Sequence, residues 1–365
     1  MTTYPAFPRT VCILGCGGFI GSHLVERILG TTDWLIYGID RSPSKISEHL
    51  ANPKFTYANI NIESPAGVEE YIKKSDAVIS LVALCNPSLY NTIPLEVIRS
   101  NFTRPLEIVD RCAALKKWLI HFSTCEVYGT TVSHQANVPF NSGTDVFKEE
   151  TTPFVLGPIH AQRWTYACAK QLLERAIYGY GFERGLAYTV VRPFNFIGPR
   201  MDFLPGIDGE GVPRVLACFM EALLSQKPLK LVDGGRNRRC FTAIEDAVGA
   251  VMAILAHPDS AKGRVFNVGN PRNETTIAGL AGTMIALYRE LLPESADFPY
   301  VTQDVTSSEF YGEGYEDSDR RVPDITLAKT LLGWEPAVPL DKALRTAMAF
   351  YIKEYANAHA VREAI

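Results

Sequence analysis

A glycine-rich turn between two apolar runs is the feature that most constrains the fold of this chain. An apolar run at residues 11–14 is followed by three glycines and a helical pattern, and a second apolar run occupies residues 34–39. The glycines are Gly15, Gly18 and Gly21. This order predicts a strand, a tight turn, a helix and a second strand, and such a βαβ unit pairs its strands in parallel. We therefore expect the chain to begin as a parallel α/β layer.

The alternation of strand-like and helical segments continues beyond this first unit. Strand-like runs lie at residues 77–84, 118–122 and 187–191, and helical patterns lie at residues 95–115 and 166–180. Strands that alternate with helices over this length predict a doubly wound parallel sheet with helices on both faces. We assign this α/β fold to residues 1–192, as the cofactor-binding domain.

Beyond residue 192 the sequence predicts a smaller, discontinuous lobe. Prolines and glycines mark a loop-rich stretch that precedes further alternation. We expect helices at 212–225 and 244–255, strands at 229–232 and 265–268, and two or three helices after residue 275, joined by the charged segment 307–323. Residues of about 240–270 would return to the main sheet, whereas residues 193–239 and 271–365 would form a substrate-binding lobe.

The composition excludes several classes of protein. The 365 residues carry 36 Lys and Arg against 40 Asp and Glu, so a formal net charge of −4 gives no reason to expect a nucleic-acid partner. The apolar run at residues 247–256 is about half of what a membrane span requires. No secretory signal is visible. We expect a soluble, cytoplasmic protein whose eight cysteines are mostly reduced, and no metal, because nothing near Cys12 and Cys16 completes a zinc site.

The glycine turn has the context of a dinucleotide-binding fingerprint. Glycines there let backbone N–H groups approach a pyrophosphate at a helix N-terminus. Asp40 ends the second strand, 19 residues after Gly21, where a carboxylate binds the ribose hydroxyls of adenosine. A carboxylate repels a 2′-phosphate, which favours NAD over NADP, although the adjacent Arg41 weakens this preference. The alternative is a glycine-rich turn without a ligand.

Two further motifs suggest acid/base chemistry. Tyr166 and Lys170 are four residues apart on an expected helix and so share a face. A nearby ammonium would favour the phenolate of a tyrosine, although such a pair alone is more often a surface helix. Thr124 and Glu126 follow the strand that ends at residue 122, and the ends of strands face the cofactor crevice in such folds. Without other context these two are a helix cap and a loop acid.

These motifs together resemble the extended short-chain dehydrogenase/reductases that act on nucleotide sugars, and within them the UDP-glucuronic acid decarboxylases. The residues that carry this resemblance are QRWTY at 162–166, RPFN at 192–195 and LVDGG at 231–235. Nucleotide-sugar dehydratases have an acid where this chain has Cys125, which disfavours dehydration. Cysteine at both 85 and 125 is similar to the UDP-apiose/UDP-xylose synthases, whereas the bacterial polymyxin-resistance decarboxylase domain has alanine and serine. The segments 200–209 and 310–315 also follow the synthase pattern.

The resemblance implies a sequence of reactions on UDP-glucuronic acid. Tyr166 would take the proton of the sugar 4-hydroxyl while NAD takes a hydride from C4, and the resulting β-keto acid would lose CO2. Arg321 and Glu126 would position the carboxylate and handle protons, and Thr124 and Arg163 would fix the sugar. Reduction then gives UDP-xylose, or UDP-apiose after the C2–C3 bond opens and closes to a branched furanose.

The resemblance also implies three sets of site residues. The catalytic set is Thr124, Glu126, Tyr166, Lys170, Cys85, Cys125, Arg163 and Arg321. The cofactor-binding set is Gly15, Gly18, Phe19, Ile20, Gly21, Asp40, Asn61, Ile62, Leu81, Asn101, Tyr166 and Lys170. The substrate-binding set is Tyr90, Asn195, Arg214, Lys230, Arg239, Tyr315 and Arg321, of which the lysine and arginines could equally be solvated surface charges.

Several alternatives stay open on the sequence. A simpler decarboxylase would make UDP-xylose or release a UDP-4-keto-pentose. A non-catalytic NAD-sensing protein usually lacks the Tyr, Lys or Thr that are present here, and a 4-epimerase would not need Arg321. Related enzymes dimerise through two helices, here around 101–115 and 164–179, so we expect a homodimer. We also hypothesise that Cys85 and Cys125 bias the product toward apiose without being needed for oxidation at C4.

Overall fold

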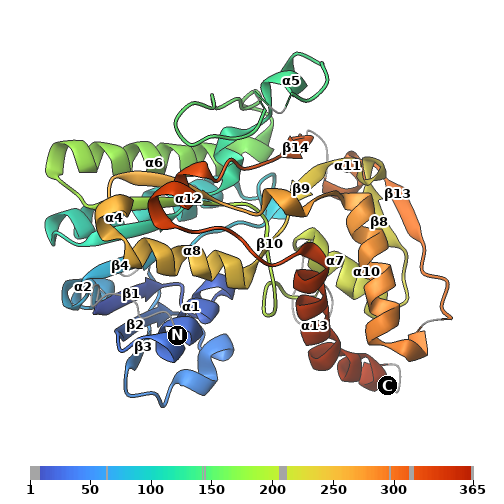
Figure 1. Cartoon of the computed structure of the whole chain (residues 1–365), viewed down its shortest axis with the longest axis horizontal. Helices are drawn as coiled ribbons and strands as arrows, with labels where there is room; N and C mark the ends of the chain where they lie inside the picture. Colours follow the sequence, from blue (N-terminus) through green and yellow to red (C-terminus); the bar gives the residue numbers. More distant parts are fainter. Residues whose placement is uncertain are drawn as a thin grey trace.

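The computed structural model describes residues 9–62, 65–141, 143, 145–204, 212–295, 297–311 and 316–362. Its centre is a seven-stranded parallel sheet with the strand order β11-β6-β5-β4-β1-β2-β3 (Figure 1). The strands are β1 (Thr10–Leu14), β2 (Leu35–Asp40), β3 (Phe55–Asn59), β4 (Ala77–Ser80), β5 (Trp118–Phe122), β6 (Tyr188–Pro193) and β11 (Arg264–Val268). The order reverses between β1 and β4, which places a crevice at their carboxyl ends. The predicted doubly wound α/β fold is confirmed.

Helices cover both faces of this sheet. The helices α1 (Phe19–Thr31) and α8 (Ile244–Ala256) pack on one face, and α2 (Pro65–Lys74), α4 (Arg104–Ala114) and α6 (Thr165–Arg184) pack on the other. Successive side chains of a strand point to opposite faces. Val11 and Ile13 of β1 therefore join the core under α1 and α8, whereas Cys12 and Leu14 join the core under α2, α4 and α6. Because both faces are covered, β1 is apolar and buried from Val11 to Leu14.

A second group of elements packs beside the carboxyl ends of the sheet. It contains the helices α7 (Val215–Leu224), α10 (Ile277–Leu291) and α13 (Leu340–Arg362), seen at the right of Figure 1. Two short sheets accompany them: β8 (Leu229–Val232) pairs with β13 (Thr302–Val305), and β9 (Arg238–Cys240) pairs with both β12 (Glu274–Thr276) and β14 (Arg320–Arg321). In the parallel β9–β14 pair Arg239 lies opposite Arg321, which brings two guanidinium groups to one place.

Several boundaries differ from the sequence-based expectation. The strand expected to reach residue 84 ends at Ser80. The helix expected over residues 95–115 is divided into α3 (Pro94–Ile98), a π-helical turn at Arg99–Thr103, and α4. Pro105 lies in the first turn of α4 and has no N–H for an i→i−4 bond, while Arg104 N–H bonds to Arg99 O, five residues back. The helix expected at 212–225 begins only at Val215, because Pro213 precedes it.

The sequence also left some elements unassigned. The strand β3 is at the edge of the sheet and is only partly buried, so its residues form no clear apolar run. Near the C-terminus the segment 307–323 is more than a connection, because it contains the short helix α11 (Ser307–Tyr311) and β14, and α12 (Thr326–Leu332) follows it. Across the described residues, no helix is long and apolar enough to cross a membrane.

Candidate active site

The glycine turn brings backbone N–H groups to the start of α1. Gly15 adopts a left-handed φ of 91°, and its N–H donates to Ile39 O at 2.8 Å. A Cβ on Gly21 would lie 2.1 Å from Gly15 O, so only glycine allows the helix to approach the turn this closely. A Cβ on Gly17 would lie 2.1 Å from Ser42 O. The sequence reasoning missed Gly17, although it stands within the glycine run.

Asp40 lies at the end of β2 and is already oriented by the backbone. Its Oδ2 accepts from Gly17 N–H at 2.9 Å, and its Oδ1 accepts from the N–H groups of Arg41 and Ser42 at 2.7 and 3.2 Å. A carboxylate held in this way faces the turn. The glycine turn, the helix N-terminus and the fixed carboxylate together fit the pyrophosphate and the adenosine ribose of a dinucleotide.

The other predicted cofactor positions gather around the same crevice. Phe19 and Ile20 begin α1, Asn61 and Ile62 follow β3, and Leu81 follows β4. A Cβ on Gly15 would lie 3.3 Å from Leu81 Cβ, so Leu81 is next to the turn. These residues come from different strands whose carboxyl ends meet at one edge.

Asn101 is buried and holds the chain that follows β4. Its Nδ2 donates to Leu84 O and Val97 O at 2.9 Å each, and its Oδ1 accepts from Leu84 N–H at 3.2 Å. In this structure Asn101 therefore positions the wall of the crevice that leads to Cys85.

The predicted acid/base residues meet beside this crevice. Thr124 caps the 3₁₀ turn Cys125–Tyr128, accepting from Glu126 N–H at 3.1 Å, and its hydroxyl is hydrogen-bonded to that of Tyr166. Lys170 is buried, one turn further along α6, and its Nζ donates to Phe122 O at 2.9 Å. Tyr90 stacks on Tyr166 with the ring centroids 5.3 Å apart. The strand end and the helix thus place a hydroxyl, a phenol and an ammonium together.

The surroundings of these groups set their protonation. Burial raises the pKa of Tyr166 well above its ordinary value, and Cys85 and Glu126 raise it further, whereas the bond from Thr124 opposes them. Burial lowers the pKa of Lys170 to about 8. We expected the ammonium to favour a phenolate; in the protein alone, burial of the phenol outweighs such effects. A cationic ring beside Tyr166 would act in the opposite direction.

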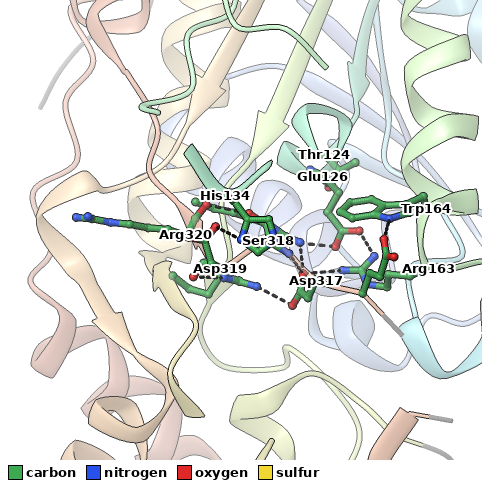
Figure 2. A network of polar contacts seen from close by, with 12 residues as sticks. Thr124, Glu126, His134, Arg163, Trp164, Asp317, Ser318, Asp319 and Arg320 are labelled. Carbon is green, nitrogen blue, oxygen red and sulfur yellow. Dashed lines mark hydrogen bonds and ion pairs between the residues drawn. The ribbon is translucent and has the colours of Figure 1, made fainter. Parts of the chain in front are cut away.

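A buried cluster of arginines and carboxylates adjoins this group (Figure 2). Arg163 Nη1 donates to Glu126 Oε2, and Arg321 Nη1 lies 3.6 Å from Glu126 Oε1. Asp317 binds Arg239 Nη2 at 2.6 Å and Arg321 Nη2 at 2.5 Å, and its Oδ1 lies 3.7 Å from Arg163 Nη2. The cluster holds three cations and two anions, so one positive charge stays uncompensated within it.

The arginines keep both carboxylates ionised. Burial alone would raise the pKa of Glu126, but Arg163 and Arg321 outweigh it and hold that pKa below its ordinary value. Burial also opposes ionisation of Asp317, yet Arg239 and Arg321 lower its pKa strongly. Glu126 is therefore a carboxylate at neutral pH.

Asp317 is the member of this cluster that the sequence reasoning missed. It precedes β14, and its contacts come from β9, from the 3₁₀ turn Gln162–Trp164 and from β14 itself. The only local signal is its position four residues before Arg321 within a charged segment, which is also the pattern of a solvated surface.

The two cysteines singled out earlier lie close to these groups. Cys85 is exposed and lines the cleft, whereas Cys125 is buried beneath it and is hydrogen-bonded to Arg321. Desolvation raises the pKa of Cys85, and burial raises the pKa of Cys125 to about 11 despite the opposing effect of Arg321. Both are therefore thiols at neutral pH, able to donate a proton.

A cavity of about 670 Å³ opens from the cluster toward the second group of elements. Five of the predicted substrate-binding residues line it: Asn195, Arg214, Lys230, Arg239 and Arg321. Asn195 holds a strained φ of 41° and donates to Cys240 O at 3.2 Å. Tyr90 is instead buried, and its ring stacks on Tyr166. The guanidinium carbon of Arg163 lies 5.5 Å from the centroid of the Tyr90 ring. Tyr315 lies outside the described residues.

Comparison with known proteins decides the family. Residues 11–269 match the NAD dependent epimerase/dehydratase family. The chain belongs to this family. A UDP-D-apiose/UDP-D-xylose synthase of Oryza sativa subsp. japonica is 47% identical over 97% of this chain and 92% of its own length. UDP-D-apiose/UDP-D-xylose synthase 1 of Arabidopsis thaliana is also 47% identical, over 97% of this chain and 94% of its own length. The resemblance predicted from the motifs is thus confirmed.

Solved structures show the same architecture. The PbgP3 protein of Burkholderia pseudomallei is 35% identical, with a TM-score of 0.83 over 97% of this chain and 99% of its own. The UDP-glucuronic acid 4-epimerase of Bacillus cereus, solved with UDP-glucuronic acid and NAD, has a TM-score of 0.77 at 21% identity, over 95% of this chain and 100% of its own. At that identity the second likeness shows the fold alone.

Proposed function

We propose that this protein is an NAD-dependent enzyme that converts UDP-glucuronic acid into UDP-apiose and UDP-xylose. The observation that carries the proposal is the buried Glu126–Arg321 pair beside Thr124 and Tyr166. Oxidation at C4 needs only NAD and the acid/base residues, whereas decarboxylation needs groups that hold a sugar carboxylate and manage protons at C5. The relatives at 47% identity support the same reaction.

Oxidation at C4 depends on Tyr166 and its neighbours. NAD, held by the glycine turn and Asp40, supplies the chemistry of hydride uptake and return. Tyr166 accepts the proton of the 4-hydroxyl, and Thr124 donates a hydrogen bond that stabilises the phenolate. Lys170, on the same helix as Tyr166, contributes a positive charge. Its pKa of about 8 means that most Lys170 side chains are protonated at neutral pH.

Loss of CO2 follows from the 4-ketone, because the carboxylate at C5 is then β to a carbonyl that accepts the electrons. Arg321 faces the cavity and offers a planar fork that suits a carboxylate. Its fork is also held by Asp317, so it is fixed before substrate binds. Glu126, kept ionised by its two arginines, accepts protons from sugar hydroxyls. Its negative charge also repels the sugar carboxylate, which favours the loss of CO2.

The branched product requires further proton transfers. When the 2-hydroxyl loses its proton, C2 becomes an aldehyde as the C2–C3 bond breaks, and the electrons of that bond form the enolate of the C4 ketone. The thiols of Cys85 and Cys125 are protonated in this environment, and we assign them proton donation during ring opening and closure. Replacement with Cys85→Ala and Cys125→Ser is expected to retain CO2 release and raise the share of UDP-xylose. An unaltered product ratio would contradict this role.

We further propose a substrate-binding lobe and a homodimer. The lobe comprises residues 193–239 and 271–365, and its cationic residues Arg214, Lys230 and Arg239 would meet the diphosphate. For the homodimer, the support is that α6 exposes Leu172, Tyr178 and Phe182, by 50%, 63% and 83%. Sedimentation of the wild type and of Leu172→Glu tests the dimer: a monomeric wild type contradicts it. A cytoplasmic location stays a prediction from sequence.

The experiment for the activity is product analysis with purified protein, NAD and UDP-glucuronic acid. We expect CO2 and two UDP-pentoses, one branched and one linear. A linear pentose alone would favour the simpler decarboxylase, and UDP-galacturonic acid without CO2 would show a 4-epimerase. Tyr166→Phe is the control, since the same protein without its acid/base hydroxyl is expected to form no products.

A further inference from the structure

One side of the cavity contains an arginine whose donors are almost all occupied. Arg214 precedes α7 and lines the cavity. Its Nε donates to Asp202 Oδ2 at 2.8 Å and its Nη2 donates to Asp202 Oδ1 at 2.9 Å, which makes a two-pronged pair. Nη2 also donates to Met201 O at 3.2 Å. These bonds use every N–H of Nε and Nη2.

These bonds leave one nitrogen of this cavity-lining guanidinium for a ligand. Of the three guanidinium nitrogens of Arg214, Nη1 alone has no hydrogen bond to the residues that the structure describes. Two parallel bonds to a carboxylate fix the plane of a guanidinium as well as its position. An arginine without such a partner keeps its rotamer freedom and loses it only when a ligand binds.

Asp202 is itself held in place on its backbone. Its N–H donates to the Tyr351 hydroxyl at 3.0 Å, and that hydroxyl donates to Asp202 O at 3.1 Å. Tyr351 is fully buried on α13, close to the other end of the chain. The Tyr351 hydroxyl thus bonds both backbone polar groups of Asp202, the residue whose carboxylate pairs with Arg214.

The same segment is also fastened to the cofactor side. Arg200, with a left-handed φ of 63°, donates to Glu26 Oε2 on α1 at 2.7 Å. Lys45 Nζ donates to Arg200 O at 2.7 Å. Residues 200–202 are therefore bonded to α1 and Lys45 on one side and to α13 on the other. These bonds fix the backbone of Asp202 and so the position of its carboxylate.

We propose that Asp202 is a positioning residue for diphosphate recognition: it orients Arg214 so that the free Nη1 end points at the diphosphate of a nucleotide sugar, and Tyr351 holds Asp202 for this task. This inference rests on the proposed function, because it deepens the description of the same substrate site.

The proposal predicts an effect of opposite sign to simple electrostatics. Asp202→Asn removes a negative charge near a site for an anion, so charge alone would tighten binding of a diphosphate. Loss of orientation instead weakens it, since the amide can accept from only one prong and turns its NH2 toward the other. The direction of the change in affinity separates the two explanations.

The test measures UDP binding by calorimetry on the full chain with NAD, together with KM and kcat for UDP-glucuronic acid. For Asp202→Asn we expect Kd and KM to rise about tenfold, while kcat stays within about twofold. Tyr351→Phe keeps the ring and all charges, and we expect it to raise Kd about threefold. Glu221→Gln is the charge-matched control, because Glu221 also lines the cavity but bonds to Lys227 and Ser225 rather than to Arg214.

A double variant shows whether Asp202 acts through the arginine. If it does, Asp202→Asn adds no further loss of UDP affinity to Arg214→Ala. Equal or tighter UDP binding by Asp202→Asn than by Glu221→Gln overturns the proposal, as does a full additive loss in the double variant. A fall of kcat alone also overturns it, because orientation of a diphosphate acts on binding.

The outcomes also separate this inference from the proposed function. A wild type that binds UDP but leaves UDP-glucuronic acid unchanged contradicts the proposed function, and the UDP affinities of the variants then still decide the role of Asp202. A wild type that does not bind UDP overturns both.

Discussion

Replacing Asp317 by Asn is the change whose consequences follow most directly from the structure. The carboxylate contacts Arg239 and Arg321 at 2.6 and 2.5 Å, and its side chain is 17% exposed. Removing one partner from a buried ion pair costs about 3–5 kcal/mol. Asn keeps one accepting oxygen, so we expect the lower end, about 3 kcal/mol. With a typical unfolding entropy per residue, this corresponds to a fall of roughly 4 °C in Tm for a chain of this length.

The same substitution is expected to slow decarboxylation. Among the residues that the structure describes, Glu126 is then the carboxylate that Arg163 and Arg321 share, and the excess positive charge of the cluster rises by one. Arg321 then turns from the cavity toward Glu126. We expect CO2 release from labelled UDP-glucuronic acid to fall at least tenfold, whereas formation of NADH at C4 falls less.

The pH dependence gives an independent check. The pKa of Asp317 is lowered in the folded protein, so its contribution to stability is fully present above the ordinary carboxyl pKa of about 4 and is lost as the pH falls. Thermal unfolding should therefore show the full difference between wild type and Asp317→Asn at pH 7 and a shrinking difference toward pH 3.

Asp319→Asn provides the matched control for this prediction. Asp319 is in the same segment but is 43% exposed, and its carboxylate lies 3.4 Å from His134. An exposed pair of this kind contributes at most about 1 kcal/mol. The reasoning is refuted if Asp317→Asn unfolds at the wild-type temperature at pH 7, if the difference is independent of pH, or if the control loses as much stability.

Three further predictions follow from other parts of the site. Gly21→Ala should weaken NAD binding at least tenfold in a fluorescence titration, because its Cβ would lie 2.1 Å from Gly15 O; unchanged affinity would contradict the close approach. Activity should decline as the pH rises through about 8, where Lys170 loses its proton, and Lys170→Arg should move that decline upward in a kcat profile. Glu174→Gln leaves Arg192 buried with a lost charge partner at 2.6 Å, and should lower the free energy of unfolding by about 3–5 kcal/mol in a urea titration.

The parts of the site that were predictable depend on local spacing. Tyr166 and Lys170 share a helix face because they are four residues apart, and Thr124 reaches the crevice because it follows a strand directly. The fold followed from the same kind of signal: apolar runs of strand length, separated by helical patterns. The edge strand β3 was not predicted because only two of its five residues, Phe55 and Ala58, are buried, so it forms no apolar run. The π-helical turn before Pro105 interrupts a helical pattern that is otherwise continuous in the sequence.

The arginine–carboxylate cluster was predictable only in part, for a reason of distance along the chain. Its members come from residues 126, 163, 239, 317 and 321, and the register of β9 against β14 brings the last three together. The family resemblance pointed to Glu126, Arg163, Arg239 and Arg321, but not to Asp317. In the sequence, Asp317 is one of several acidic residues in a charged segment. No feature of the neighbouring sequence distinguishes an aspartate that is paired with three arginines from one that is exposed to solvent.

The most direct test of the proposed activity is carbon NMR of the products formed from UDP-glucuronic acid labelled with carbon-13 throughout the sugar, with NAD and the purified protein. The account predicts labelled CO2 together with a branched UDP-pentose, in which one carbon carries three carbon neighbours, and a linear UDP-pentose. Tyr166→Phe should give neither. Unchanged substrate, or a product that retains all six labelled carbons, would contradict the account.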